Sequence, residues 1–243
     1  MSLSLLQPSF LMSKTRRYAQ ILIGSRLFLT AMAIHLSFRV APLDLQQGEN
    51  SRIIYVHVPA SRMSILLYIA TAINTFFFLL TKHPLFLRSS GTGPEIGAFS
   101  TFFTLVTGVF RGRPMWGTFR VWDARIISVV ISLLIYLAAI AFQKLSVELA
   151  SLFICLGLIN IPIIKFSVDW WNTLHQPASI RLFDTSIHLS MLIPIMSNFA
   201  NLLFLSSIFF VLETRLLILS FLESPLSEEI EGRKEIAKPS LLA

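Results

Sequence analysis

Apolar residues in this chain come in runs that are long enough to cross a lipid bilayer. A membrane-spanning helix needs roughly 20 predominantly apolar residues. We expect six spans, of which the third is short, at 18–38, 54–81, 95–110, 126–142, 148–166 and 199–220. The stretch 185–198 mixes prolines and polar residues with apolar ones and is expected to lie as an interfacial helix against the membrane. The pattern therefore predicts an all-α, polytopic integral membrane protein.

Six spans divide the chain between the two faces of the membrane. Both termini then share one face, called side B. The loops 39–53, 111–125 and 167–198 share the other face, called side A. We expect residues 1–222 to form a single transmembrane domain and residues 223–243 a charged, mobile tail. The basic, acid-free N-terminus fits both a plain tail and an organelle-targeting segment.

Composition narrows the functional classes. Of 243 residues, 54% are hydrophobic and only 14% charged, which leaves no room for a large soluble domain. The net charge of +7 is typical of membrane topology and contact with anionic lipid, and no nucleic-acid-binding motif occurs. The single cysteine, Cys155, excludes an intrachain disulfide and a C-x-x-C redox pair. The chain also lacks the phosphate-binding loop of nucleotide-driven pumps.

The densest cluster of charge and aromatic rings, RGRPMWGTFRVWDARI at 111–126, lies between two apolar runs. All four tryptophans fall in side-A loops, whereas an aromatic belt would populate both membrane interfaces. Lys and Arg usually concentrate in the loops on one side of the membrane, but here they are almost equally numerous on both sides. Side A therefore carries arginines that the topology rule alone does not explain. These arginines and tryptophans are therefore candidates for ligand binding.

Histidines flank this cluster in the sequence. His57 begins the second span and His175 lies in the third side-A loop, where His188 is an alternative on spacing alone. Imidazole is a common axial ligand of haem iron, and Trp faces can lie on a flat macrocycle. Arg forks pair with carboxylates, and haem carries two propionates. Asp123 either pairs with a nearby Arg or caps the fourth span's helix.

These segments also resemble a known family. WGTFRVWDAR resembles the tryptophan-rich WWD signature of haem-handling membrane proteins. YVHVPA and WWNTLHQP resemble the histidine segments of the CcmC family of cytochrome c maturation. SGTGPEIGAF and the end FLESPL extend the likeness over nearly the whole chain, in the form that plant mitochondria use. The order of the motifs makes the resemblance specific.

The resemblance implies a non-enzymatic role in cytochrome c biogenesis at the mitochondrial inner membrane. The chain would bind haem b non-covalently at the intermembrane-space face and present it to the haem chaperone CcmE. Its other partners would be membrane lipid, the ABC-transporter subunits CcmA and CcmB, and a CcmD-like small subunit. The implied axial ligands are His57 and His175. The implied signature loop and propionate-binding residues are Trp116, Gly117, Trp122, Asp123, Arg125 and Arg113.

The chain departs from the family pattern at two positions. Arg120 stands where the family usually has Trp, and Phe119 where it often has Trp. Phe119 keeps an aromatic face, whereas Arg120 replaces a flat apolar ring with a cation. These differences put the affinity of the loop for haem in question.

Two other functions fit parts of the pattern. A transporter carrying haem across the bilayer would place polar groups along its path, and Asn74 and Asn160 are candidates. No second cluster is found on side B to receive the haem. A b-type redox cytochrome would need histidines at mid-membrane depth, but those of side A lie at the ends of spans.

Overall fold

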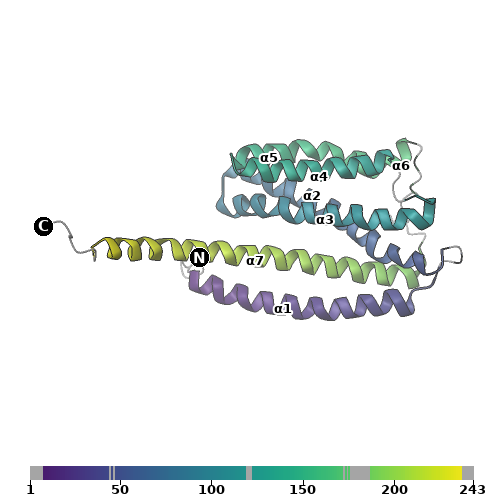
Figure 1. Cartoon of the computed structure of the whole chain (residues 1–243), viewed down its shortest axis with the longest axis horizontal. Helices are drawn as coiled ribbons and strands as arrows, with labels where there is room; N and C mark the ends of the chain where they lie inside the picture. The colour runs from purple at the N-terminus through teal and green to yellow at the C-terminus, as the bar shows by residue number, and fades with distance from the viewer. Residues whose placement is uncertain are drawn as a thin grey trace. The chain divides into compact units, whose positions relative to one another are not determined.

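We describe a computed structural model at residues 8–43, 45, 47–118, 122–171, 173, 175 and 187–236. Regular secondary structure in these residues is helical, as the sequence predicted. The long helices of Figure 1 are α1 Pro8–His35, α2 Ile54–Thr81, α3 Pro84–Trp116, α4 Ala124–Gln143, α5 Val147–Leu156, α6 Asn160–Trp170 and α7 Leu189–Ile236. Short helical pieces are η2 Leu36–Val40, η3 Glu49–Ile53 and η4 Gly157–Ile159.

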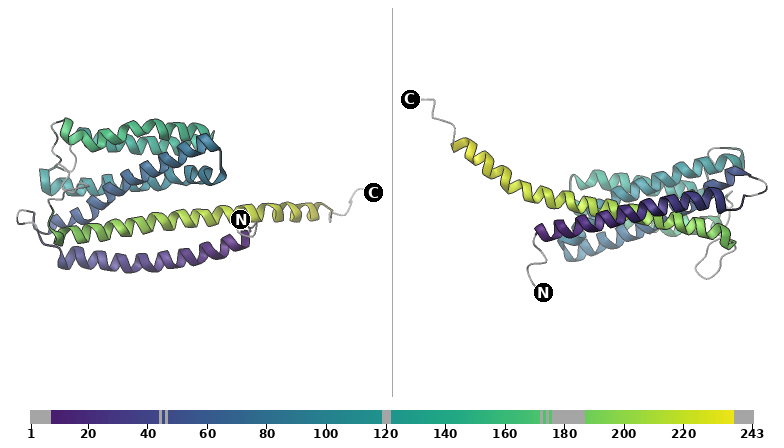
Figure 2. Two further views of the ribbon diagram at one scale, coloured as in Figure 1. Left: turned by 180° about the vertical axis from the view of Figure 1, so that it is seen from behind. Right: turned by 90° about the horizontal axis from the view of Figure 1, so that it is seen from below.

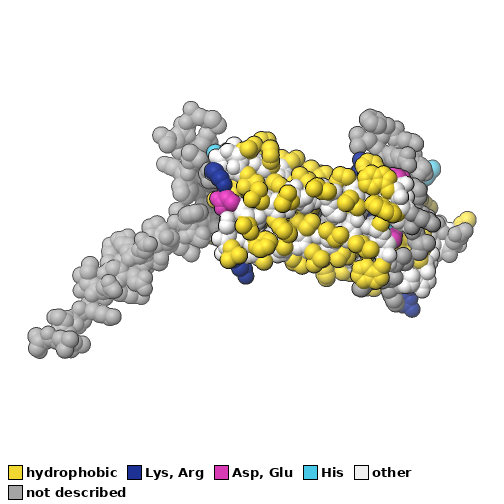
Figure 3. All heavy atoms as spheres, turned by 90° about the horizontal axis from the view of Figure 1, so that it is seen from above, with side chains coloured by type: hydrophobic (Ala, Val, Ile, Leu, Met, Phe, Trp, Pro, Cys, Tyr) yellow, Lys and Arg dark blue, Asp and Glu magenta, His cyan; other side chains and the backbone are white. Residues whose placement is uncertain are grey.

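Five helical stretches of the described residues are long and apolar enough to cross a membrane. They are Arg16–Val40, Glu49–Thr81, Ala124–Gln143, Val147–Trp170 and Leu189–Glu213. They confirm a polytopic all-α membrane protein. On the face drawn in Figure 3, hydrophobic side chains cover the helices and the charged side chains gather at the helix ends. That distribution suits a protein surrounded by lipid.

The third expected span lies within α3, which is longer and more polar than we expected. At 33 residues α3 has ample length, but serine, threonine and glycine lower its hydropathy. Thr101, Thr104 and Thr107 are buried and donate to backbone carbonyls one turn earlier in the same helix. Because these hydroxyls are satisfied internally, the helix tolerates them in an apolar setting. Because α3 is not among the candidate spans, the six-span topology stays a prediction.

The expected interfacial helix at 185–198 is wrong. Helix α7 begins at Leu189, and the same helix supplies the last candidate span. Pro194 is fully buried, and Ile195 packs in a core cluster with Ala41 and Tyr55. The described part of the stretch from Leu189 is thus a partly buried, continuous part of α7 and not a separate helix. The helix also continues to Ile236, so the expected mobile tail is helical at 223–236.

The chain divides into two compact units. The larger is Arg26–Ser206, and the other comprises Met1–Ser25 with Ser207–Ala243. In the larger unit α2 packs along α3, α3 along α4, and α4 along α5 (Figures 1 and 2). Its core is a cluster of Tyr68, Ala72, Ala98, Tyr136, Ala139, Ala150 and Ile154.

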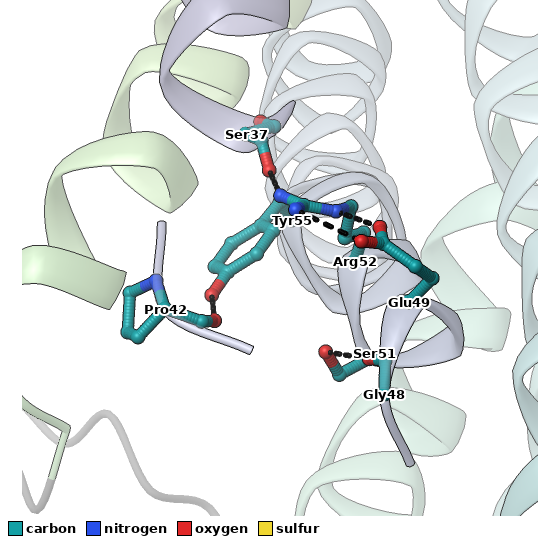
Figure 4. Close-up of polar contacts among 7 residues, drawn as sticks. All are labelled: Ser37, Pro42, Gly48, Glu49, Ser51, Arg52 and Tyr55. Carbon is teal, nitrogen blue, oxygen red and sulfur yellow. Dashed lines mark hydrogen bonds and ion pairs between the residues drawn. The ribbon is translucent and has the colours of Figure 1, made fainter. Parts of the chain in front are cut away.

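Polar contacts fix the start of α2 (Figure 4). The Arg52 guanidinium donates to the Ser37 carbonyl over 2.6 Å and pairs with the Glu49 carboxylate. The Tyr55 hydroxyl donates to the Pro42 carbonyl over 3.2 Å, and its side chain is fully buried. These bonds tie the segment after α1 to the first turn of α2, and so determine where the next residues of α2 point.

Candidate functional site

The larger unit contains a cavity of about 310 Å³ between α2, α3, α4 and α6. This volume lies at the lower end of the range of small-molecule sites, roughly 300–1,000 Å³. Five of the residues predicted from the sequence line it: His57, Trp116, Trp122, Arg125 and His175. The structure thus brings together side chains from three separate segments of the chain.

His57 projects into the cavity from the first turn of α2. Its Nδ1 lies 3.0 Å from the Thr107 hydroxyl oxygen on α3. The Thr107 hydroxyl hydrogen is directed to the Phe103 and Thr104 carbonyls, so its oxygen accepts from His57. Nδ1 therefore carries the proton and Nε2 keeps its lone pair. Gly108 makes room, since a Cβ there would lie 3.1 Å from the His57 ring.

His175 is oriented by a carboxylate. Its Nδ1 lies 2.6 Å from Asp123 Oδ2, and Asp123 Oδ1 accepts from the Ile126 N–H as the N-cap of α4. The N-cap role predicted for Asp123 is confirmed, and its other carboxylate oxygen is hydrogen-bonded to His175 rather than to an arginine. Burial lowers the pKa of His175 although Asp123 raises it. The imidazole is therefore neutral near pH 7, as a metal ligand must be.

The end of α3 places one tryptophan against this histidine. Gly117 has a φ of 70° and donates its N–H to the Arg113 carbonyl over 3.0 Å, which terminates the helix. The preceding ring, Trp116, lies 4.9 Å from the His175 ring between centroids. Trp122 also lines the cavity but is 61% exposed. One aromatic face is thus inside the site and another is at its edge.

The arginines are arranged differently from our prediction. Arg125 lines the cavity, whereas Arg113 is exposed and is not among the lining residues. Arg62 and Arg111 line the cavity and were missed. Arg62 could have been found from the sequence, because a charged residue inside a membrane span is a candidate functional residue. Phe119 and Arg120 lie outside the described residues.

A family model described as CcmC, heme exporter protein C, matches residues 1–224. The chain belongs to the CcmC family. It is 77% identical over its full length to a putative cytochrome c biosynthesis ccmC-like mitochondrial protein of Arabidopsis thaliana, of which 95% is covered. It is 66% identical to a protein of the same name from Marchantia polymorpha, covering 91% of this chain and 97% of that one.

A bacterial relative is more distant. The chain is 39% identical to the heme exporter protein C of Escherichia coli, over 75% of this chain and 76% of that protein. CcmC membership confirms the predicted haem handling in cytochrome c biogenesis. The mitochondrial relatives and the apolar helices confirm the expected location in a mitochondrial membrane.

Several residues that the sequence analysis considered do not line the cavity of this CcmC-family chain. His188 bonds to the Ser190 hydroxyl over 2.8 Å at the start of α7, and is not a lining residue. Trp170 and Trp171 are half exposed and also lie outside the lining. Trp170 stacks on Phe166 with 5.4 Å between the ring centroids. Among the described residues, the cavity geometry favours His175 over His188.

The two asparagines suspected of marking a transport path have structural partners. The Asn160 amide donates to the Ser128 carbonyl over 2.7 Å and to the Ser132 hydroxyl over 2.8 Å, joining α6 to α4. The Asn74 amide donates to the Ala70 carbonyl in its own helix. Neither residue lines the cavity. Their polarity is accounted for by helix packing.

Proposed function

We propose that this chain binds haem b non-covalently and presents it to the haem chaperone CcmE, without catalysing a reaction itself. The observation that carries the proposal is the pair His57 and His175. Both line one cavity, and each has its Nδ1 hydrogen-bonded within the protein. That arrangement leaves two Nε2 lone pairs for the two axial positions of one iron. Six-coordinate iron is protected from reaction with oxygen.

The rest of the site suits the macrocycle. Trp116 and Trp122 offer flat apolar faces at the inside and the edge of the cavity. Arg111 and Arg125 supply the guanidinium groups for the two propionates, with Arg111 in place of the predicted Arg113. The vinyl edge faces the chaperone at the mouth. The site therefore holds the haem while leaving its reactive edge accessible.

The proposed location and partners follow the CcmC family. We place the cavity mouth at the intermembrane-space face of the mitochondrial inner membrane. The partners are CcmE, the ABC-transporter subunits CcmA and CcmB, and a CcmD-like small subunit. Because the sequence contains no phosphate-binding loop, partners supply the energy for release.

The second candidate function is haem movement across the bilayer. The cavity lining follows α2 from Ile54 to Tyr68, which is about four helical turns. Tyr68 lies in the middle of α2, and among the described residues none of α2 beyond it lines the cavity. A site that reaches one face and stops at mid-span suits holding and presentation better than passage.

Covalent transfer of haem to the chaperone tests the proposal. The chain would be co-expressed with CcmE, and haem on CcmE measured by haem staining after denaturing electrophoresis. His57→Ala and Trp116→Ala are expected to abolish or strongly reduce the signal. Trp170→Ala, outside the cavity, is the matched control and should leave it unchanged. Equal haem transfer by all four proteins would contradict the proposal.

A further inference from the structure

The two cavity histidines have chemically different hydrogen-bond partners. His175 donates from Nδ1 to the Asp123 carboxylate over 2.6 Å, whereas His57 donates to the neutral Thr107 hydroxyl over 3.0 Å. Hydrogen bonds to an ionised acceptor are roughly twice as strong as neutral ones. A carboxylate behind a metal-binding imidazole also raises its basicity as a ligand. His175 is therefore the stronger donor of the two.

The different partners of the two histidines are positioned by helices α4 and α3. Asp123 is 7% exposed, and its second oxygen accepts the Ile126 N–H at the positive N-terminal end of α4. The two contacts with Ile126 and His175 fix the direction of the carboxylate. The Thr107 hydroxyl hydrogen is already shared with two carbonyls of α3, so the hydroxyl brings no negative charge to His57.

We propose that His175 is the axial ligand retained during haem transfer and that His57 is the one exchanged. This inference rests on the proposed function. In the exchange, the bond between iron and His57 Nε2 would break and one bond from a donor atom of the acceptor protein would form in its place. Such a ligand exchange leaves the oxidation state of the iron unchanged. Asp123 and Thr107 are positioning residues that set this order.

Carbon monoxide binding to the purified, haem-loaded ferrous protein tests the order, because carbon monoxide replaces one axial ligand. Its association rate reports how readily that ligand leaves. Its stretching frequency responds to the donor strength of the ligand that stays opposite. Asp123→Asn keeps an oxygen to cap α4 but replaces the carboxylate by a neutral amide. Thr107→Val removes the hydroxyl, and Thr107→Ser is its matched control.

We expect Asp123→Asn to shift the carbon monoxide stretch and to raise the haem midpoint potential, because it weakens the retained ligand. Thr107→Val should leave the stretch at the wild-type position and speed carbon monoxide association about 10-fold, within the range of second-sphere effects. Thr107→Ser should behave as the wild type in both measurements.

Other results would overturn either this inference or the proposed function. A stretch that moves in Thr107→Val but not in Asp123→Asn would show that His57 is retained, and would overturn the inference. Equal shifts in both variants would also overturn it. If Thr107→Val fails to fold, a carbon monoxide stretch in Asp123→Asn that stays at the wild-type position would by itself overturn the inference. A wild-type protein without a spectrum of two axial histidines would instead overturn the proposed function.

Discussion

At the scale of single residues, two imidazoles that line one cavity have their Nδ1 atoms already hydrogen-bonded. The histidines themselves could be predicted, because their positions beside the Trp and Arg cluster are visible in the sequence. Their partners could not be predicted, since Thr107 is 50 residues from His57 and Asp123 is 52 residues from His175. Only the packing of α2 on α3 and the start of α4 create those pairs.

The pKa of His175 leads to a prediction about pH. Because burial lowers that pKa, the neutral imidazole persists to lower pH than usual. Haem binding should therefore hold down to about pH 6.5, the ordinary pKa of imidazole, and be lost only in more acidic solution. Titration of the haem absorption band measures this. Loss of binding centred above that pH would contradict it.

The Asp123 carboxylate raises the pKa of His175, so its removal has a predictable sign. In Asp123→Asn the acid limit of haem binding should move to still lower pH, even though the affinity at neutral pH falls. The same titration measures both changes. His188→Gln, outside the cavity, is the control and should leave the acid limit in place.

Gly117 ends α3 with a φ of 70°, and a Cβ added there meets no atom within 4 Å. A substitution should therefore cost only backbone strain. We expect Gly117→Val to destabilise the protein by about 1–2 kcal/mol, and Gly117→Asn by less, because Asn tolerates this conformation. Thermal unfolding in detergent compares them. Equal melting temperatures for both variants and the wild type would contradict this role for Gly117.

At the scale of helices, hydropathy predicted where spans lie but not where every helix ends. α2 was expected at 54–81 and is found at Ile54–Thr81. α3 begins at Pro84, eleven residues before the predicted third span, because the polar stretch before that span is helical as well. Within it, the Ser90 hydroxyl donates to the Leu87 carbonyl over 2.7 Å. Hydropathy counts such side chains as polar, whereas the helix satisfies them.

Close packing between helices leads to a testable prediction at this scale. A Cβ at Gly157 would lie 2.0 Å from the Tyr68 hydroxyl, which donates to the Ile154 carbonyl over 3.1 Å. Gly157→Ala should cost about 1–3 kcal/mol through overpacking. Tyr68→Phe should cost about 1 kcal/mol through the lost hydrogen bond. The double variant should be more stable than the sum of the two costs implies, and strict additivity in thermal unfolding would contradict the contact.

At the scale of the whole molecule, the number of spans decides which loops share a face. If α3 crosses the membrane, the loop before α2 and the loop between α4 and α5 lie on opposite faces. Leu45 and Leu145 are exposed positions in these loops. The sequence could not decide this, because α3 is long enough to cross but not clearly apolar.

Cysteine labelling measures the topology. In a Cys155→Ser background, Leu45→Cys should react with a membrane-impermeant maleimide in mitochondria stripped of their outer membrane. Leu145→Cys should react only after detergent is added. Reaction of both variants before detergent would show that α3 does not cross and that the six-span topology is wrong.

The most direct test of the haem site is the visible absorption spectrum of the purified protein, oxidised and reduced, beside His57→Gly and His175→Gly. The wild type should give a low-spin spectrum of two axial histidines. Each Gly variant should lose it and recover it when imidazole is added, because both cavity histidines line the same site. A wild-type protein that takes up no haem, or variants with unaltered spectra, would contradict the assignment of His57 and His175 as the axial ligands.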